Sequence, residues 1–235
     1  MKIIIIGVAA LLPAFILWLY IWKKDTQKEP TSWLVKAVLW GVVICFPVAI
    51  LETGIQTTLF GVDAQPTTLF DTTIVAFVVA ALPEELFKLF ALWMVLRKNP
   101  YFDEHFDGIV YAVCVGLGFA AMENVMYLFG EEDWITTAVL RAFLAVPGHY
   151  AFAILMGYYY SVCYFIDDSP KNIVCILLAP ILAHGIYDTI AMSGYLSPIV
   201  ECISFCVLIF FCVKMHKAAN NRVLTLIEKD KKLKI

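Results

Sequence analysis

Two adjacent carboxylates and a lysine interrupt a long apolar run in the segment ALPEELFKLF, residues 81–90. Glu84 and Glu85 stand four and three residues before Lys88, the spacings at which side chains meet on one face of a helix. The lysine can therefore neutralise one carboxylate and leave the other. A charged side chain near the bilayer centre costs about 2.5 to 3.5 kcal/mol on insertion scales, so such a group indicates a function.

Ionisable and amide side chains recur in three later apolar runs. They are Glu123 and Asn124 in GFAAMENVMY, Arg141 and His149 in the next run, and His184 and Asp188 in HGIYD. Groups at similar depth in several spans favour convergence on one polar site. Pro83, Pro147 and Pro180 each precede a candidate group by one to four residues. Because proline kinks a helix and frees a backbone carbonyl, these bends could open a pocket that contains water.

Histidines together with carboxylates can bind zinc, and a catalytic zinc site uses about three protein ligands and a water. A nearby carboxylate can accept the proton of that water and pass it to a leaving amine. A metal-free variant stays open, in which a glutamate activates water directly and the histidines stabilise the oxyanion. Ser161 and Ser204 have no histidine at helical spacing, which disfavours a serine nucleophile. The residues thus indicate hydrolysis.

The composition indicates where these groups lie. Of the 235 residues, 62% are hydrophobic and 16% are charged, whereas a soluble domain carries about 25% charged residues. The net charge of −3, with no basic face, excludes a nucleic-acid partner. All seven cysteines lie in apolar runs without a C-x-x-C pair, so neither disulfides nor a thiolate zinc site are expected. The chain is a membrane protein.

We predict an all-α fold, a polytopic membrane bundle of about seven transmembrane helices, because runs of about 20 apolar residues in lipid must be helical. The predicted spans are 3–22, 33–52, 72–96, 108–129, 136–166, 172–192 and 196–214. The fifth span contains Arg141 and is too long for one straight crossing. Its first turns are expected in the interface, before the helix bends inward.

Lysine and arginine gather in alternate loops of this predicted bundle. The first, third and fifth loops and the C-terminal tail carry them, whereas the second, fourth and sixth loops carry none. Under the positive-inside rule, this pattern predicts the N-terminus outside and the C-terminus in the cytoplasm. We expect one transmembrane helical domain over residues 1–217 and a tail over 218–235. The tail is predicted as a short, basic amphipathic helix at the inner membrane surface.

Several segments together resemble the PrsW family of intramembrane proteases. They are PEELFK at 83–88, FDEHFDGIVY at 102–111, GLGFAAMENVMY at 116–127, Arg141 with PGH at 147–149, and HGIYD at 184–188. The resemblance extends to about Lys217, and the order and spacing of the segments are more specific than any one motif. It implies a multi-pass endopeptidase of a bacterial cell membrane. Its expected partner is a single-pass anti-sigma factor, which it would cut first (site-1 cleavage) before later proteases release a stress-response sigma factor.

The family also resembles the wider clan of CAAX prenyl endopeptidases, in which paired glutamates and two histidines form the active site. By that resemblance, the expected catalytic residues are Glu84, Glu85, His149 and His184. Asp188 stands where the clan often has asparagine. Its role stays open between binding metal, orienting His184 and assisting the oxyanion.

We expect Glu84 to act as the general base, and Glu85 to bind metal or to pair with Lys88. The candidate ligands of Zn2+ are His149, His184, Glu85 and Glu123. The expected supporting residues are Lys88, Glu123, Asn124, Arg141 and Asp188. Arg141 is expected to pair with a carboxylate or a lipid headgroup.

A proton-coupled transporter is the alternative from another class, since buried carboxylates, a lysine and histidines also suit a proton relay. Transporters commonly contain internal repeats, and the two halves of this sequence show no convincing similarity. Together with the resemblance, this favours the hydrolase.

Overall fold

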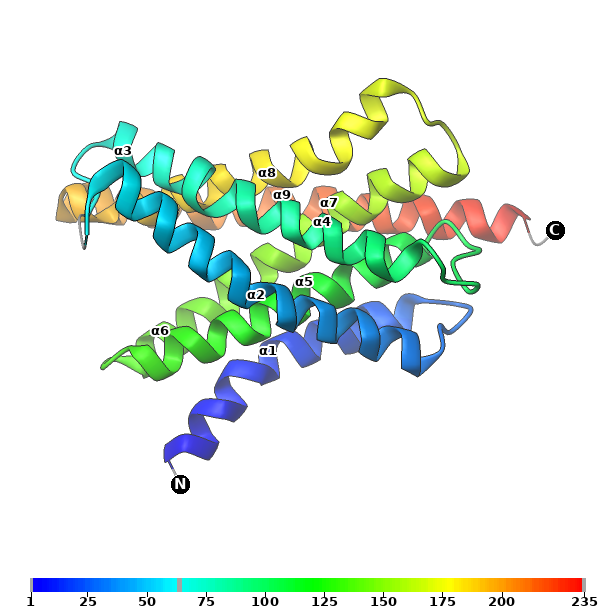
Figure 1. Ribbon diagram of the computed structural model, residues 1–235, viewed down its shortest axis with the longest axis horizontal. Helices are drawn as coiled ribbons and strands as arrows, with labels where there is room; N and C mark the ends of the chain where they lie inside the picture. Colours follow the sequence, from blue (N-terminus) through cyan, green and yellow to red (C-terminus); the bar gives the residue numbers. More distant parts are fainter. Residues whose placement is uncertain (1, 63–64, 234–235) are drawn as a thin grey trace.

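Long helices dominate the computed structural model, which describes residues 2–62 and 65–233 (Figure 1). The α-helices are α1 (Lys2–Lys24), α2 (Thr31–Phe60), α3 (Leu69–Ile74), α4 (Leu82–Leu96), α5 (Asp107–Gly130), α6 (Trp134–Leu140), α7 (Val146–Phe165), α8 (Pro170–Met192) and α9 (Pro198–Leu233). Two π-helical segments, η1 (Val75–Ala81) and η2 (Arg141–Ala145), and one 3-10 segment, η3 (Ser193–Leu196), connect some of them. Within the described residues, six helices are long and apolar enough to cross a membrane, and α3, η1 and α4 together form the remaining predicted span. The expected all-α membrane bundle is confirmed.

The helix boundaries agree with the sequence except at two places. Helices α1, α5 and α8, and the combined α6–η2–α7 segment, match their predicted spans to within two residues at each end. Helix α2 runs to Phe60 instead of ending at residue 52. Thr53 and Thr58 donate side-chain hydrogen bonds to the carbonyls of Ala49 and Gly54, one turn earlier, over 2.8 and 2.7 Å, so both hydroxyls have partners within the helix. Glu52 therefore lies inside the helix and not at its end.

The second difference concerns the tail, which continues α9 without a break and does not form a separate surface helix. Met215, Ala219, Val223 and Leu226 are buried, and their spacing of three or four residues extends the apolar stripe of α9 into the tail. The predicted division between residues 217 and 218 therefore corresponds to no helix end.

Each π-helical segment ends two residues before a proline. η1 precedes Pro83 and η2 precedes Pro147, while Pro180 lies inside the α-helix α8. Proline lacks an N–H and its ring clashes with the carbonyl four residues earlier, so the preceding turn widens. Each π turn leads directly into a helix that carries candidate site residues.

Helix α5 occupies the centre of the bundle and packs against α1, α2, α4 and α7. Its contacts with two neighbours depend on glycine. A Cβ atom on Gly41 of α2 would lie 2.1 Å from the carbonyl oxygen of Val115, and one on Gly116 of α5 would lie 2.8 Å from the Cβ of Ala153 in α7. The backbones of α2, α5 and α7 therefore approach closely, which fixes the side chains that face one another across them.

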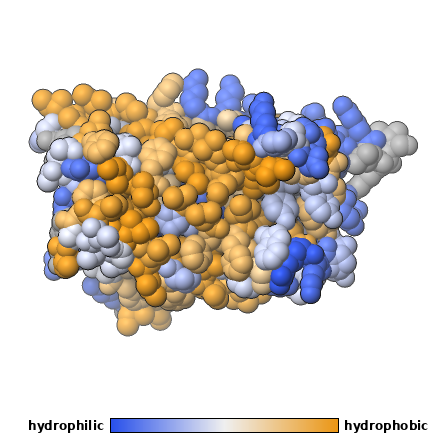
Figure 2. All heavy atoms as spheres, turned by 45° about the horizontal axis from the view of Figure 1, so that its top comes forward, coloured by the Kyte–Doolittle hydropathy of each residue, from blue (hydrophilic) through white to orange (hydrophobic). Residues whose placement is uncertain are grey.

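The loops that carry lysine and arginine meet at one end of the bundle, the right-hand end in Figure 1. This cationic end contains the α1–α2, α4–α5 and α7–α8 connections and the end of α9. On the face in Figure 2, apolar side chains cover most of the surface, and the most hydrophilic residues gather mainly towards one end. This arrangement agrees with the alternation of charge along the sequence. The assignment of the cationic end to the cytoplasm stays a prediction.

At the cationic end, Asp230 of α9 caps the start of α5. Its carboxylate accepts hydrogen bonds from the backbone N–H groups of His105 and Phe106, both at 2.9 Å, and lies 2.5 Å from His105 Nδ1. Nearby, Tyr111 donates a hydrogen bond to Glu29, and burial raises the pKa of that carboxyl to about 7. Through Asp230, the last turns of α9 thus fix the backbone of His105 and Phe106, immediately before the start of the central helix α5.

Replacing Asp230 by asparagine should lower the free energy of unfolding by about 1 to 3 kcal/mol. The amide has a single acceptor oxygen and places N–H groups against the backbone donors. Thermal unfolding in detergent micelles measures the effect. Glu228→Gln is the matched control, because Glu228 is exposed on the same helix. Equal transition temperatures for the two variants would contradict the capping role of Asp230.

Candidate active site

The candidate residues come from four helices and one π segment, and the structure brings them together. Glu84, Glu85 and Lys88 belong to α4, Glu123 and Asn124 to α5, Arg141 to η2, His149 to α7, and His184 and Asp188 to α8. Glu84, Glu85, Lys88, His149 and His184 are all buried. Hydrogen bonds and ion pairs connect these side chains into one polar network inside the apolar bundle.

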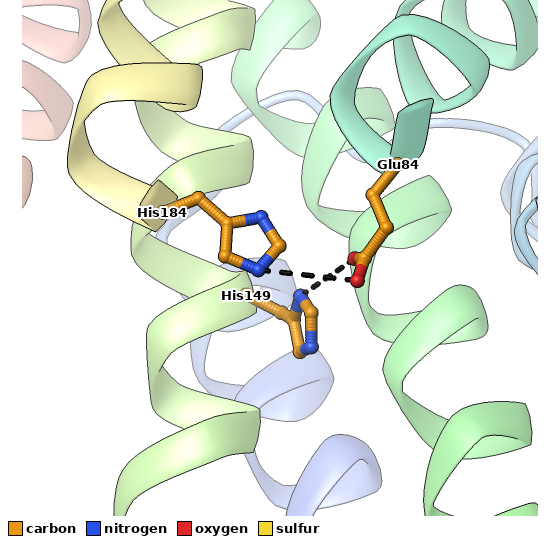
Figure 3. Close-up of side chains that lie close together, drawn as sticks. All are labelled: Glu84, His149 and His184. Atoms are coloured by element: carbon orange, nitrogen blue, oxygen red, sulfur yellow. Dashed lines mark ion pairs between the residues drawn. The ribbon is translucent and has the colours of Figure 1, made fainter. Parts of the chain in front are cut away.

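Glu84, His149 and His184 form the tightest group (Figure 3). One ligand atom from each residue lies within 4.8 Å of those of the other two. The Glu84 carboxylate faces both imidazoles, at 3.9 Å from His149 Nδ1 and 3.9 Å from His184 Nε2. Two imidazoles and a carboxylate are the donor set of a common catalytic zinc site.

Each imidazole is held by a further carboxylate at its other ring nitrogen. His149 Nε2 lies 2.8 Å from Glu123, and His184 Nδ1 lies 2.9 Å from Glu85. Carboxylates in this position fix the orientation and tautomer of metal-binding histidines. Glu85 and Glu123, expected as candidate ligands, are thus bonded to the nitrogens that point away from Glu84.

Lys88 lies between the carboxylates and His149. Its ammonium is 2.8 Å from Glu84, 2.9 Å from Glu85 and 3.1 Å from His149 Nδ1. The sequence predicted that Lys88 would neutralise only one of the two carboxylates, whereas it contacts both. An ammonium group only donates, so the hydrogen-bond network assigns Nδ1 of His149 as acceptor and Nε2 as the protonated nitrogen that donates to Glu123.

Arg141 extends the network towards α1. It donates hydrogen bonds to Glu123 at 2.6 Å and to Asn124 at 2.5 Å, and its guanidinium lies 4.2 Å from the centre of the Tyr127 ring. Asn124 in turn donates to the backbone carbonyl of Ala10 in α1, at 3.1 Å. Asp188 lies at the opposite side of the site, 3.2 Å from His184 Nε2.

A cavity of about 830 Å³ opens beside this network. Six of the candidate residues contribute to its polar wall: Glu84, Glu123, Arg141, His149, His184 and Asp188. Glu85 and Lys88, also within the described chain, are not part of that wall. Of the two adjacent glutamates, Glu84 therefore faces the cavity, and Glu85 lies behind it.

The sequence analysis missed other polar residues of the cavity, among them Glu52 of α2 and Glu201 and Ser204 of α9. Glu52 was treated as the end of a span. The apolar residues Ile55 and Leu59, which continue the helix beyond it, are the signal that could have placed Glu52 inside the membrane segment.

Comparison with known proteins agrees with this arrangement. The sequence profile of the PrsW family intramembrane metalloproteases matches residues 29–215. The chain is 34% identical over 219 residues to protease PrsW of Oceanobacillus iheyensis, covering 92% of this chain and 97% of that protein. It is 34% identical over 207 residues to protease PrsW of Clostridioides difficile, covering 86% and 85%, and 32% identical over 193 residues to that of Bacillus subtilis, covering 80% and 84%.

No solved structure matches the chain. The family match nevertheless decides between the two classes that the buried polar groups had left open, because it supports a peptidase and not a transporter. The chain is therefore a multi-pass membrane peptidase that belongs to the PrsW family of intramembrane metalloproteases.

Proposed function

We propose that Glu84, His149 and His184 form the catalytic centre with which this peptidase hydrolyses a peptide bond in the membrane. The observation that carries the proposal is the Glu84 carboxylate, 3.9 Å from the facing nitrogen of each histidine at the wall of the cavity. A substrate backbone and a water molecule can reach this wall, which is otherwise enclosed by apolar helices.

Glu84 is the proposed general base. Its neighbours Glu85, Glu123 and Asp188 each lie within 3.2 Å of a histidine nitrogen, whereas Glu84 stays 3.9 Å from both. Glu84 can accept the proton of the attacking water and return it to the leaving amine. Glu85 and Glu123 are positioning residues, because they hold the two imidazoles.

His149 and His184 are the residues that would hold a divalent cation, for which we propose Zn2+, and the Glu84 carboxylate would face it as the base. When bound, the cation supplies Lewis-acid polarisation of the scissile carbonyl. The two imidazole nitrogens and the carboxylate that faces them fit such an ion, because one atom of each lies within 4.8 Å of the other two.

The proposed substrate is a single-pass, membrane-anchored anti-sigma factor, in which this peptidase makes the first cut. The proposal rests on the resemblance of the sequence motifs to the PrsW family. The proposed location is a bacterial cell membrane, since the relatives come from bacteria.

Glu84→Gln should lower kcat by a factor of about 100 to 10,000, since it removes the proton acceptor and keeps the shape of the side chain. Glu85→Gln should lower activity by only about 10 to 100-fold, because it weakens the support of His184. The measurement is cleavage of the single-pass substrate in liposomes. Glu132→Gln, in an exposed loop, is the control. Full activity of Glu84→Gln would refute its role as base.

Glu123→Gln should weaken zinc binding by about 10 to 100-fold, because the neutral amide holds His149 less firmly. Competition with a chelator of known affinity measures the effect. Glu201→Gln provides the control, because Glu201 lines the same cavity and belongs to another helix. If both variants bind zinc as tightly as the unaltered chain, Glu123 does not position His149.

Removing the metal should abolish cleavage, and adding back Zn2+ should restore it. Elemental analysis of the purified protein should find about one zinc ion per chain, and the His149→Ala and His184→Ala variants should lose it. Retention of full activity after chelation, with no metal found, would instead establish the metal-free mechanism in which Glu84 alone activates water.

A further inference from the structure

Glu52 of α2 is a carboxylate of the cavity to which the proposed chemistry gives no role. It lines the cavity together with Glu84 and Glu123. Glu84 pairs with Lys88, and Glu123 pairs with Arg141. In contrast, the buried oxygen Oε1 of Glu52 has no hydrogen-bond partner among the described residues. A buried acceptor without a donor is unfavourable, so a ligand that brings a donor to Glu52 gains affinity.

The helix places Glu52 inside the membrane segment, on the face that lines the cavity. Cys45, Val48, Ala49 and Glu52 all line the cavity, and their spacing puts them on one side of α2. The helix continues for eight residues beyond Glu52, to Phe60, which is about 12 Å. Val48 and Ala49 have no side-chain donor. A partner for Glu52 would therefore come from within the cavity.

The packing of α2 on α5 shows how deep Glu52 lies. Both helices start at the cationic end, and a Cβ atom on Gly41 would collide with Val115 and Phe119 of α5 (Figure 1). Glu52 follows Gly41 by 11 residues, or about 16 Å of helix. Glu123 follows Val115 by eight residues and Phe119 by four, or about 12 and 6 Å. Glu52 thus lies roughly 4 to 10 Å farther from the cationic end than Glu123, a distance that an extended chain spans in about one to three residues.

The charges around the cavity indicate which donor Glu52 would bind. The described lining contains six carboxylates and one arginine: Glu52, Glu84, Glu123, Glu131, Asp188, Glu201 and Arg141. Together with Lys88 behind the wall, the six carboxylates and two cations have a formal charge of −4, and a bound divalent cation would leave −2. Walls of low dielectric constant focus such a field, so the cavity attracts a further cation.

We propose that Glu52 binds a cationic side chain of the substrate, lysine or arginine, about one to three residues from the cleaved bond. Either side chain donates charge-assisted hydrogen bonds to a carboxylate. A lone cation in a membrane segment is as unfavourable as a lone carboxylate, and the pair removes both costs. Glu52 would thus determine specificity and take no part in the bond-breaking step. The inference rests on the proposed function, because it takes the cavity as the place of cleavage.

A lysine scan of one substrate tests this assignment. The probe is a single-pass anti-sigma factor that the unaltered chain cleaves in liposomes, with the cleaved bond mapped by mass spectrometry. Lysine, or methionine as a neutral side chain of similar length, replaces each of the four residues on either side of that bond in turn. The ratio of kcat/KM for lysine to that for methionine is measured with the unaltered full chain, Glu52→Gln and Glu52→Asp. Glu201→Gln is the matched control, because Glu201 lines the same cavity from α9 and is exposed.

The unaltered chain and Glu201→Gln should show a ratio of about 10 to 100 at one position, one to three residues from the bond. The ratio should fall to 1 or below in Glu52→Gln and stay above 1 in Glu52→Asp, which keeps the charge. Because each ratio compares two substrates of one preparation, a smaller folded fraction does not change it. A ratio of 1 or below at every position with the unaltered chain would overturn the proposal, as would an unchanged ratio in Glu52→Gln or an equal loss in Glu201→Gln. Failure of the proposed base would appear separately, as full cleavage of every substrate by Glu84→Gln.

Discussion

The cost of placing charge inside a membrane governs this structure. Glu84, Glu85 and Lys88 are buried at a depth where each ionised group alone is unfavourable by several kcal/mol. The Lys88 ammonium contacts both carboxylates and His149, so all three of its donors are used. Such a network is expensive to disrupt, because removal of one partner leaves an uncompensated buried charge. The ion pairs between Lys88 and the two glutamates thus lower the cost of burying the charged groups that the site uses for its chemistry.

The packing of the helices brings the side chains of this network within hydrogen-bond distance of one another. Helix α5 approaches α2 and α7 closely at Gly41 and Gly116, where any side chain would collide with its neighbour. This close approach brings Glu123 of α5 to 2.8 Å from His149 of α7. The π turns before Pro83 and Pro147 stand just ahead of the glutamates and of His149 in the chain, so irregular backbone occurs where the site is built. Backbone irregularity and glycine contacts are therefore part of the positioning of the polar groups.

The sequence predicted the set of site residues better than their separate roles. Apolar runs and buried ionisable groups are strong signals, so seven spans and the residues of the network could be listed from them. Adjacent residues on a helix point about 100° apart, so which of Glu84 and Glu85 faces the cavity depends on the neighbouring helices. Glu52 was missed because a polar residue late in an apolar run is typical of the end of a span. The apolar stripe of the tail was visible, but its partners lie far away in the chain.

The position of Lys88 bears on how the proposed metal would bind. Its ammonium contacts Nδ1 of His149, which belongs to the group of three ligand atoms. That nitrogen has one lone pair in the plane of the ring, so it cannot accept from the ammonium and bind a metal ion at once. A divalent cation would also repel the ammonium strongly at this distance and in this medium. For His149 to hold such an ion, Lys88 would have to leave Nδ1, and Glu85 could keep the ammonium because its Oε2 has no hydrogen-bond partner among the described residues. The formal charges of Glu84, Glu85 and Lys88 sum to −1, and those of Glu123, Arg141 and Asp188 add a further −1. The network as a whole therefore attracts a cation, and Lys88 reduces that attraction.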